Sequence, residues 1–125
     1  MGSTLFTDIA KNEISEADFS TDSFYEESAN NLIEVLKNNT SIIKINFSLS
    51  NLVDYELAPI LKTLKERPTI LEELNLDSTD ITYKSDVSIR EFITSGKVKS
   101  LLMFHLKGYD LKKWTNLQIM PQNTV

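Results

Sequence analysis

One histidine, His105, and the absence of cysteine decide most of the chemistry that this chain can carry. Without cysteine there are no disulfides, thiolate zinc sites, iron–sulfur clusters or cysteine nucleophiles. No G-x-S-x-G nucleophile motif accompanies His105, and the chain has only three glycines, so a phosphate-binding loop is missing too. We therefore expect a non-enzymatic protein with no catalytic residue, no metal and no cofactor.

Carboxylates form a second group of candidate residues. They lie beside or between the apolar residues of two segments that resemble strands, and they are Glu16, Asp18, Glu72, Glu73, Asp77 and Asp80. Alternation along a strand sends such side chains to the face opposite the apolar ones. An acidic surface favours a basic partner and speeds its approach, although simple solvation explains the same residues. Asp77-x-x-Asp80 lacks the glycine and final glutamate of a calcium-binding loop, so no calcium site is expected.

The composition is that of a globular protein of one domain. The 125 residues are 41% hydrophobic and 25% charged, with a net charge of -5. This negative charge argues against binding to nucleic acid, which needs cations that face phosphate. The N-terminus lacks the basic start and apolar run of a signal peptide, and no segment reaches the roughly 20 apolar residues of a membrane helix. We expect a cytoplasmic protein with no membrane partner.

Apolar residues recur with the same spacing in successive blocks. They stand at offsets 0, 3, 5 and 10, and in the first three blocks another pair follows eight and twelve residues later. The blocks begin at Ile14, Ile42, Leu71 and Leu101, which are 28, 29 and 30 residues apart. Spacings of two are typical of one strand face, and spacings of four are typical of one helix face. Each block therefore predicts a short strand, a turn and an amphipathic helix.

This pattern predicts an α/β fold. A single block cannot bury its own apolar face, so neighbouring blocks stack around a continuous core. We expect a right-handed solenoid of about four repeats, with a parallel sheet on the concave face and helices on the convex face. The repeats would span residues near 14–41, 42–70, 71–100 and 101–120, after a capping helix in 1–13 and before a tail at 121–125. Pro59 is expected in the first turn of a helix and Gly96 at a helix end.

The register of the fourth block has two solutions. The preferred one places Leu101, Phe104 and Leu106 in the core and leaves the histidine between the last two on the exposed side. Val98, Leu101 and Met103 fit the strand pattern as the alternative. The two registers differ in which side chains face the core.

The segment 32–47, LIEVLKNNTSIIKINF, resembles a ribonuclease-inhibitor-type leucine-rich repeat, and 70–76, ILEELNL, resembles its strand half. That class has the pattern L-x-x-L-x-L-x-x-N-x-L followed by a helix, and it includes the Ran GTPase-activating protein, NOD-like receptors and tropomodulin. The ninth position, usually Asn, is here occupied by Asp22, Ser50, Thr79 and Tyr109. The small size and the excess of eleven lysines over two arginines also resemble leucine-rich-repeat effectors of intracellular bacteria such as Legionella, which would act in the host cytosol.

Outward positions of the predicted strands supply candidate contacts. Apolar residues are expected there at Ile43, Leu49, Leu102 and Met103, flanking the acidic strand as a binding patch. The predicted partner-binding residues are Ile43, Asn46, Leu49, Glu72, Glu73, Asn75, Asp77, Leu102 and His105.

Aromatic residues add a second candidate surface. Tyr25, Tyr55 and Tyr83 each follow a strand by a few residues, and we expect them to line one edge at the strand-to-helix turns. Tyr109 and Trp114 could serve as aromatic anchors, but closure of the C-terminal end of the core is the preferred role of Trp114.

The resemblance implies a protein–protein interaction module. We expect it to bind, and to inhibit or regulate, a partner protein such as an enzyme through its concave face, as a monomer or as a heterodimer with that partner. The partner would have a basic or mixed surface. The alternatives are an adaptor that recruits a target to a larger complex, and a cytoskeletal or GTPase regulator like tropomodulin or the Ran activator.

Overall fold

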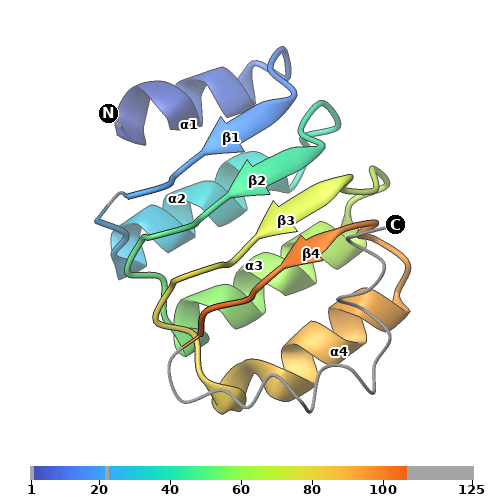
Figure 1. Cartoon of the computed structure of the whole chain (residues 1–125). Coiled ribbons are helices and arrows are strands. Elements are labelled where there is room, and N and C mark those ends of the chain that lie inside the picture. Colours follow the sequence, from blue (N-terminus) through green and yellow to red (C-terminus); the bar gives the residue numbers. More distant parts are fainter. Residues whose placement is uncertain (1, 22, 107–125) are drawn as a thin grey trace.

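The computed structural model describes residues 2–21 and 23–106, where strands alternate with helices along the chain (Figure 1). The elements in chain order are α1 (Gly2–Ala10), β1 (Glu16–Asp18), α2 (Glu26–Leu36), β2 (Lys44–Asn46), α3 (Asp54–Glu66), β3 (Glu73–Asn75), the short 3-10 helix η1 (Tyr83–Ser85), α4 (Asp86–Thr94) and β4 (Leu101–Leu102). None of the helices in these residues is long and apolar enough to cross a membrane.

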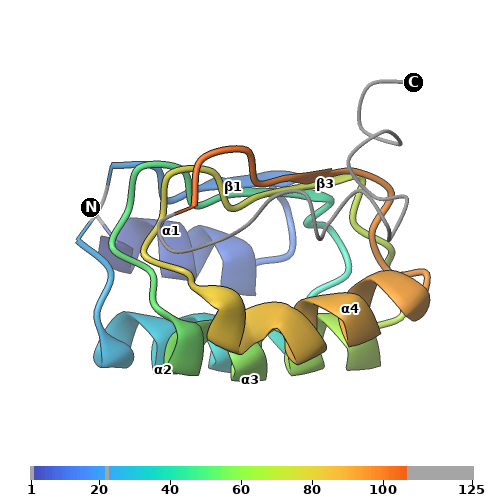
Figure 2. The same ribbon diagram turned by 60° about the horizontal axis from the view of Figure 1, so that its bottom comes forward.

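The described strands form one parallel four-stranded sheet in the order β1-β2-β3-β4. Ala17 pairs with Ile45, Ile45 with Leu74, and Leu74 with Leu101, so residues at the same offset of the apolar pattern lie side by side. The described helices lie on one side of the sheet and leave its other face bare (Figure 2). The mixed α/β fold with a parallel sheet is therefore confirmed.

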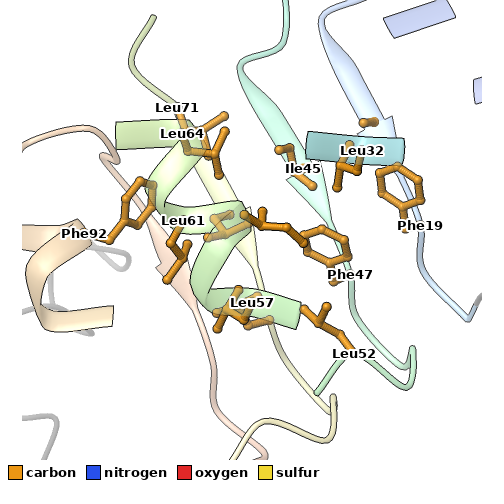
Figure 3. Packing of buried hydrophobic residues seen from close by; sticks show 14 of the residues in the cluster. Phe19, Leu32, Ile45, Phe47, Leu52, Leu57, Leu61, Leu64, Leu71 and Phe92 are labelled. Carbon is orange, nitrogen blue, oxygen red and sulfur yellow. The ribbon is translucent and has the colours of Figure 1, made fainter. Parts of the chain in front are cut away.

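The hydrophobic core lies between the sheet and its helices. Phe19 and Phe47, which follow neighbouring strands, stack with their ring centroids 5.4 Å apart. Figure 3 shows Leu32 of α2 and Leu57 and Leu61 of α3 among the side chains that fill the core, and all of them are buried. Full burial of one such side chain contributes roughly 1.5–3 kcal/mol. This continuous core fixes the position of each strand and of the turn that follows it.

The fourth strand adopts the alternative register, so the preferred one is wrong. Leu71 is bridged to Val98, which makes Val98 and not Leu101 the first residue of the fourth block. Met103, expected outside, is fully buried, whereas Phe104, expected inside, is 40% exposed. The physical reason is the length of the third block. It advances 27 residues from Leu71 to Val98, against 29 from Ile42 to Leu71, because η1 and α4 together span 12 residues where α3 has 13 and the loop that follows is one residue shorter.

This shift also changes the ninth position of the last block. Leu106 takes it in place of Tyr109 and is buried. Tyr109, together with Trp114 and its expected role in closing the core, lies outside the described residues. Of the other ninth-position residues, Thr79 is buried and donates its hydroxyl to the carbonyl of Leu76 at 2.8 Å.

The two helix-boundary predictions have opposite outcomes. Gly96 follows α4 with a φ of 77°, and its N–H donates to the carbonyl of Ile93 at 3.1 Å, which confirms it at a helix end. Pro59 lies in the second turn of α3, because that helix begins at Asp54. The sequence therefore placed the start of this helix too late.

A buried polar network joins successive blocks at the helix-to-strand end. Arg67 Nη1 donates to Asn39 Oδ1 at 2.9 Å, and its Nη2 donates to the carbonyl of Ile42 at 2.8 Å. Asn39 Nδ2 in turn donates to the carbonyl of Ile9 at 2.8 Å. Both side chains are buried, and burial lowers the pKa of Arg67 from its usual range. The network links three successive blocks at the edge opposite the candidate site.

Candidate protein-binding surface

The bare face of the sheet carries two rows of polar side chains. Glu16, Lys44 and Glu73 are paired across three strands, and Lys44 Nζ lies 4.0 Å from Glu16 Oε2. Acidic side chains were expected here, but the lysine between them was missed. It stands at the same offset as both glutamates and interrupts the negative surface. The face is therefore of mixed charge, with a shallow hollow of about 180 Å³.

The second row holds the turns that follow the strands. The side-chain oxygens of Asp18, Asn46 and Asn75 each accept the backbone N–H two residues further on, all at 2.9 Å. Side-chain and backbone hydrogen bonds from Ser20 lower the pKa of Asp18. Leu102 occupies the equivalent place in β4, beside Asn75, and has no acceptor. These side-chain oxygens are already hydrogen-bonded within their own turns, which makes them poor acceptors for a partner.

The turns beyond the strands form a groove, which we call the edge groove. Its volume is about 520 Å³. It is lined by Thr21, Ser23, Leu49, Ser50, Asn51, Ser78, Thr79, Asp80 and His105. Because all strands are parallel, their carboxyl ends meet at this one edge (Figure 1).

Equivalent residues of successive blocks share a left-handed backbone in the edge groove. Thr21, Leu49 and Ser78 have φ values of 61°, 62° and 59°. Their N–H groups donate to carbonyls of the next turn, as from Leu49 to Asp77 at 3.1 Å and from Ser78 to His105 at 3.0 Å. The turns are thus stacked on one another, and the groove is preformed.

Asp77 and His105 form a polar contact at one end of the edge groove. The backbone N–H of His105 donates to Asp77 Oδ1 at 2.6 Å, and its ring Nδ1 lies 3.1 Å from Oδ2. Burial acts to raise the pKa of Asp77, but the hydrogen bonds from His105 outweigh it and leave the pKa below its ordinary value. Within the described residues no hydroxyl is hydrogen-bonded to His105, and no group of three or more acidic or histidine side chains could hold a metal ion.

Exposed apolar side chains lie at the same edge of the molecule as the edge groove. Tyr25 precedes α2, Tyr55 lies in the first turn of α3, and Tyr83 lies in η1. We define the edge surface as the edge groove together with Tyr25, Tyr55, Tyr83, Val87 and Phe104. Leu49 is 64% exposed at the centre of this surface. One large apolar residue of the described part, Ile70, is exposed at the opposite edge, just before β3.

The nine predicted contact residues are divided between two surfaces and the far edge. On the bare sheet face lie Asn46, Glu73, Asn75 and Leu102. At the edge surface lie Leu49 and His105, and Asp77 contacts this histidine from the neighbouring turn. Ile43 and Glu72 are beside each other at the beginning of their strands, where the Glu72 N–H donates to the Ile43 carbonyl at 2.7 Å.

Sequence reasoning missed most of the groove-lining residues, among them Thr21 and Ser78. One signal was present: residues at offset 7 from Ile14, Ile42 and Leu71 line the groove in every block. With Val98 as the start of the last block, the same offset gives His105.

Solved structures with the same fold include domains of leiomodin and tropomodulin. The actin-binding site 2 of leiomodin-1 matches with a TM-score of 0.77 at 19% sequence identity, over 91% of this chain and 68% of that one. The tropomodulin C-terminal domain of Caenorhabditis elegans matches with a TM-score of 0.77 at 15% identity, over 97% of this chain and 74% of that one. No protein-family profile and no curated protein matches the sequence. At these identities the likeness establishes a common fold.

The comparisons correct the resemblance drawn from the sequence. The matching structures are leiomodin and tropomodulin domains, so the assignment to ribonuclease-inhibitor-type repeats and to a bacterial effector is wrong. The quoted segments carried only a strand–helix spacing, and that spacing is compatible with the leiomodin and tropomodulin fold as well. Six apolar positions per block do not separate proteins that share such an arrangement.

Proposed function

We propose that this protein is a non-enzymatic protein-binding domain that regulates the cytoskeleton, with actin as its partner and the edge surface as its interface. The observation that carries the proposal is the gathering of exposed apolar side chains at the edge that holds the preformed edge groove. Several exposed apolar groups at one edge are typical of protein interfaces, and tyrosine is common among the residues that contribute most to binding.

Actin as the partner rests on the leiomodin-1 domain, which is itself an actin-binding site. The cytoskeletal alternative drawn from the sequence is favoured for this reason. Inhibition of an enzyme through the sheet face has no comparable support, because Lys44 breaks the acidic row and the Asx side chains are bound to their own turns. A cytoplasmic location follows from an actin partner and is part of the same proposal.

We further propose that the blocks form a short right-handed solenoid of leucine-rich-repeat type. The pairing of Ala17, Ile45, Leu74 and Leu101, one residue from each block, supports this arrangement. So does the recurrence of the left-handed turn at the same offset. A rigid stack would present the edge surface as one continuous interface.

The first experiment measures binding of the full chain to actin. Fluorescently labelled chain is titrated with monomeric actin and followed by anisotropy, and co-sedimentation is measured with filaments. Tyr55→Ser should weaken binding at least tenfold, as expected for an aromatic interface residue. Ile70→Ser is the matched control, because it removes an exposed apolar side chain from the opposite edge, and it should leave the affinity unchanged.

Charge reversal of the sheet face separates the two surfaces. Glu73→Lys places a second cation beside Lys44 on the bare face without touching the edge groove. We expect it to change actin affinity less than Tyr55→Ser does. A larger effect from Glu73→Lys would assign the interface to the sheet face, and no measurable binding by the wild-type chain would refute actin as the partner.

A further inference from the structure

We infer that the edge groove receives an extended segment of the partner in which a cationic side chain stands next to an apolar one. This rests on the proposed protein-binding function and adds the chemistry of the segment that is bound. Two residues carry the inference: Leu49, which would contact the apolar side chain, and Asp80, which would pair with the cation.

Leu49 holds a backbone conformation that its side chain does not favour. A left-handed residue with a Cβ atom costs roughly 1–2 kcal/mol, and Gly, Asn and Asp are the usual exceptions. At the two left-handed positions that follow helices, the chain has the expected types, Asn12 and Gly96. At the centre of the edge groove it has a leucine that is 64% exposed, so burial within this chain does not compensate for the strain. The equivalent turns impose the same conformation on Thr21 and Ser78, so what distinguishes Leu49 is a large apolar side chain left exposed there, and contact with a partner would give this leucine a role.

Asp80 supplies the charge. It lines the edge groove, and its N–H donates to the carbonyl of Leu52 at 3.0 Å, which fixes its backbone. No hydrogen bond or ion pair joins its carboxylate to another of the described residues. The other aspartates nearby are occupied, since Asp54 accepts from Thr82 at 2.9 Å and Asp77 is bonded to His105. Asp80 is therefore the carboxylate of the groove that is left for a partner's lysine or arginine.

Exposed charges at the beginnings of the helices, at the same edge as Asp80, favour the same kind of partner. Glu26 and Glu27 lie in the first turn of α2 at this edge, and both are exposed. Lys84 in η1 is an exposed cation at the same edge. Among these groups the negative charges outnumber the positive one, so the groove attracts a basic segment and repels an acidic one.

The shape of the groove fits an extended segment. It crosses the ends of four neighbouring strands, from Thr21 through Leu49 and Ser78 to His105. Strands stand about 4.8 Å apart, so this path is about 14 Å long, the length of about four extended residues. Asn51 accepts the Phe24 N–H through Oδ1, which leaves its amide nitrogen in the groove as a donor to a peptide carbonyl.

The test uses the full chain, labelled with nitrogen-15, and two short synthetic peptides. One contains the sequence Lys-Leu-Lys-Leu between Gly-Ser caps, and the other has Glu in place of Lys. In amide spectra the basic peptide should shift Thr21, Leu49, Ser78 and Asp80, and the acidic peptide should not. Asp80→Asn should weaken the basic peptide about threefold to fivefold, as for an exposed ion pair. Ile70→Ser should leave its affinity unchanged.

The outcomes distinguish a failure of this inference from a failure of actin as the proposed partner. Equal binding of both peptides, shifts confined to other parts of the chain, or an unchanged affinity in Asp80→Asn would overturn the inference. If Asp80→Asn and Leu49→Asn bind actin as tightly as wild type, actin stands as the partner, but the groove is not its site and the inference is overturned. If the basic peptide binds in the groove but actin does not bind at all, the inference stands and actin is the wrong partner.

Discussion

Asp77 and His105, 28 residues apart in sequence, connect the turns after the third and fourth strands. The carboxylate accepts the His105 backbone N–H at 2.6 Å and lies 3.1 Å from the ring Nδ1. In the preceding strands an Asx side chain secures its own turn, but β4 has Leu102 at that place. Asp77 thus provides from the neighbouring strand the acceptor that the last turn lacks.

Asp77→Asn should destabilise the protein in a pH-dependent way. The folded pKa of Asp77 lies below its ordinary value of 3.8, so its stabilising contribution is complete above that pH and is lost as the pH falls through the folded pKa. We expect the variant to lose about 1 kcal/mol of unfolding free energy at neutral pH and almost nothing in strong acid. Urea denaturation at several pH values measures this. Glu72→Gln, which replaces an exposed carboxylate without hydrogen bonds in the described part, is the control and should show no such trend.

Glu56→Gln should change the unfolding free energy in the opposite direction from Asp77→Asn. Burial raises the pKa of Glu56, nearby Glu26 raises it further, and the hydrogen bond from the Val53 N–H opposes both. A raised carboxyl pKa means that the favourable contribution is present below 4.5 and is lost as the pH rises through the folded pKa. The amide keeps the acceptor and removes the buried charge, so Glu56→Gln should be more stable than wild type at neutral pH and equal to it in acid.

Glu56→Ala distinguishes the effect of the buried charge from that of the hydrogen bond to Val53, which caps the start of α3. It leaves the Val53 N–H without its acceptor and should cost about 1 kcal/mol in acid, and less than that at neutral pH, where loss of the buried charge offsets part of the cost. If Glu56→Gln and Glu56→Ala were equally destabilised at neutral pH, the buried charge would not be the source of the pH dependence.

Leu49→Asn and Gly96→Ala test the cost of the left-handed backbone, because the first introduces a residue that favours this conformation and the second removes one. Leu49 has a φ of 62° and is exposed, so asparagine should relieve strain and raise the unfolding free energy by about 1 kcal/mol. Gly96 has a φ of 77°, and a Cβ atom at this position would meet no other group within 4 Å, so alanine should cost about 1 kcal/mol through the backbone alone. Urea midpoints measure both. A loss of stability in Leu49→Asn would show that the leucine serves the fold rather than a partner.

Arg67→Ala should be among the most destabilising single changes. It removes the donors to Asn39 and Ile42 in a buried site, and we expect a loss of about 3 kcal/mol. Arg90→Ala is the matched control, because Arg90 Nε contacts Asp86 at 2.7 Å in a half-exposed ion pair of α4. That pair should contribute about 0.5 kcal/mol or less. Chemical denaturation of both variants measures the difference, and comparable losses would contradict a structural role for the buried network.

The sequence predicts the first three strands because their apolar offsets have one solution. Ala17, Ile45 and Leu74 have polar neighbours on both sides, so only one face can be buried. The fourth strand has Leu101, Leu102, Met103 and Phe104 in a row, and an apolar run does not specify which face is inward. The length of the third block decided the register, because its helical segment and the loop that follows are each one residue shorter than in the second block.

The edge groove was harder to foresee than the strands. Asn12 and Gly96 are typical of left-handed positions, but Thr21, Leu49 and Ser78 are not, so their turns give no local signal. The exposed tyrosines were correctly placed at this edge because they follow each strand at a similar distance. The mixed charge of the sheet face was missed because the acidic residues were considered without Lys44 between them.

Hydrogen–deuterium exchange of the full chain, alone and with saturating monomeric actin, tests the central claim most directly. We predict slower exchange in the turns that contain Thr21, Leu49 and Ser78 when actin is present, and no change in the segment around Ile70 at the opposite edge. Slower exchange only in β1–β3 or around Ile70, or the same exchange at every position with and without actin, would contradict the account.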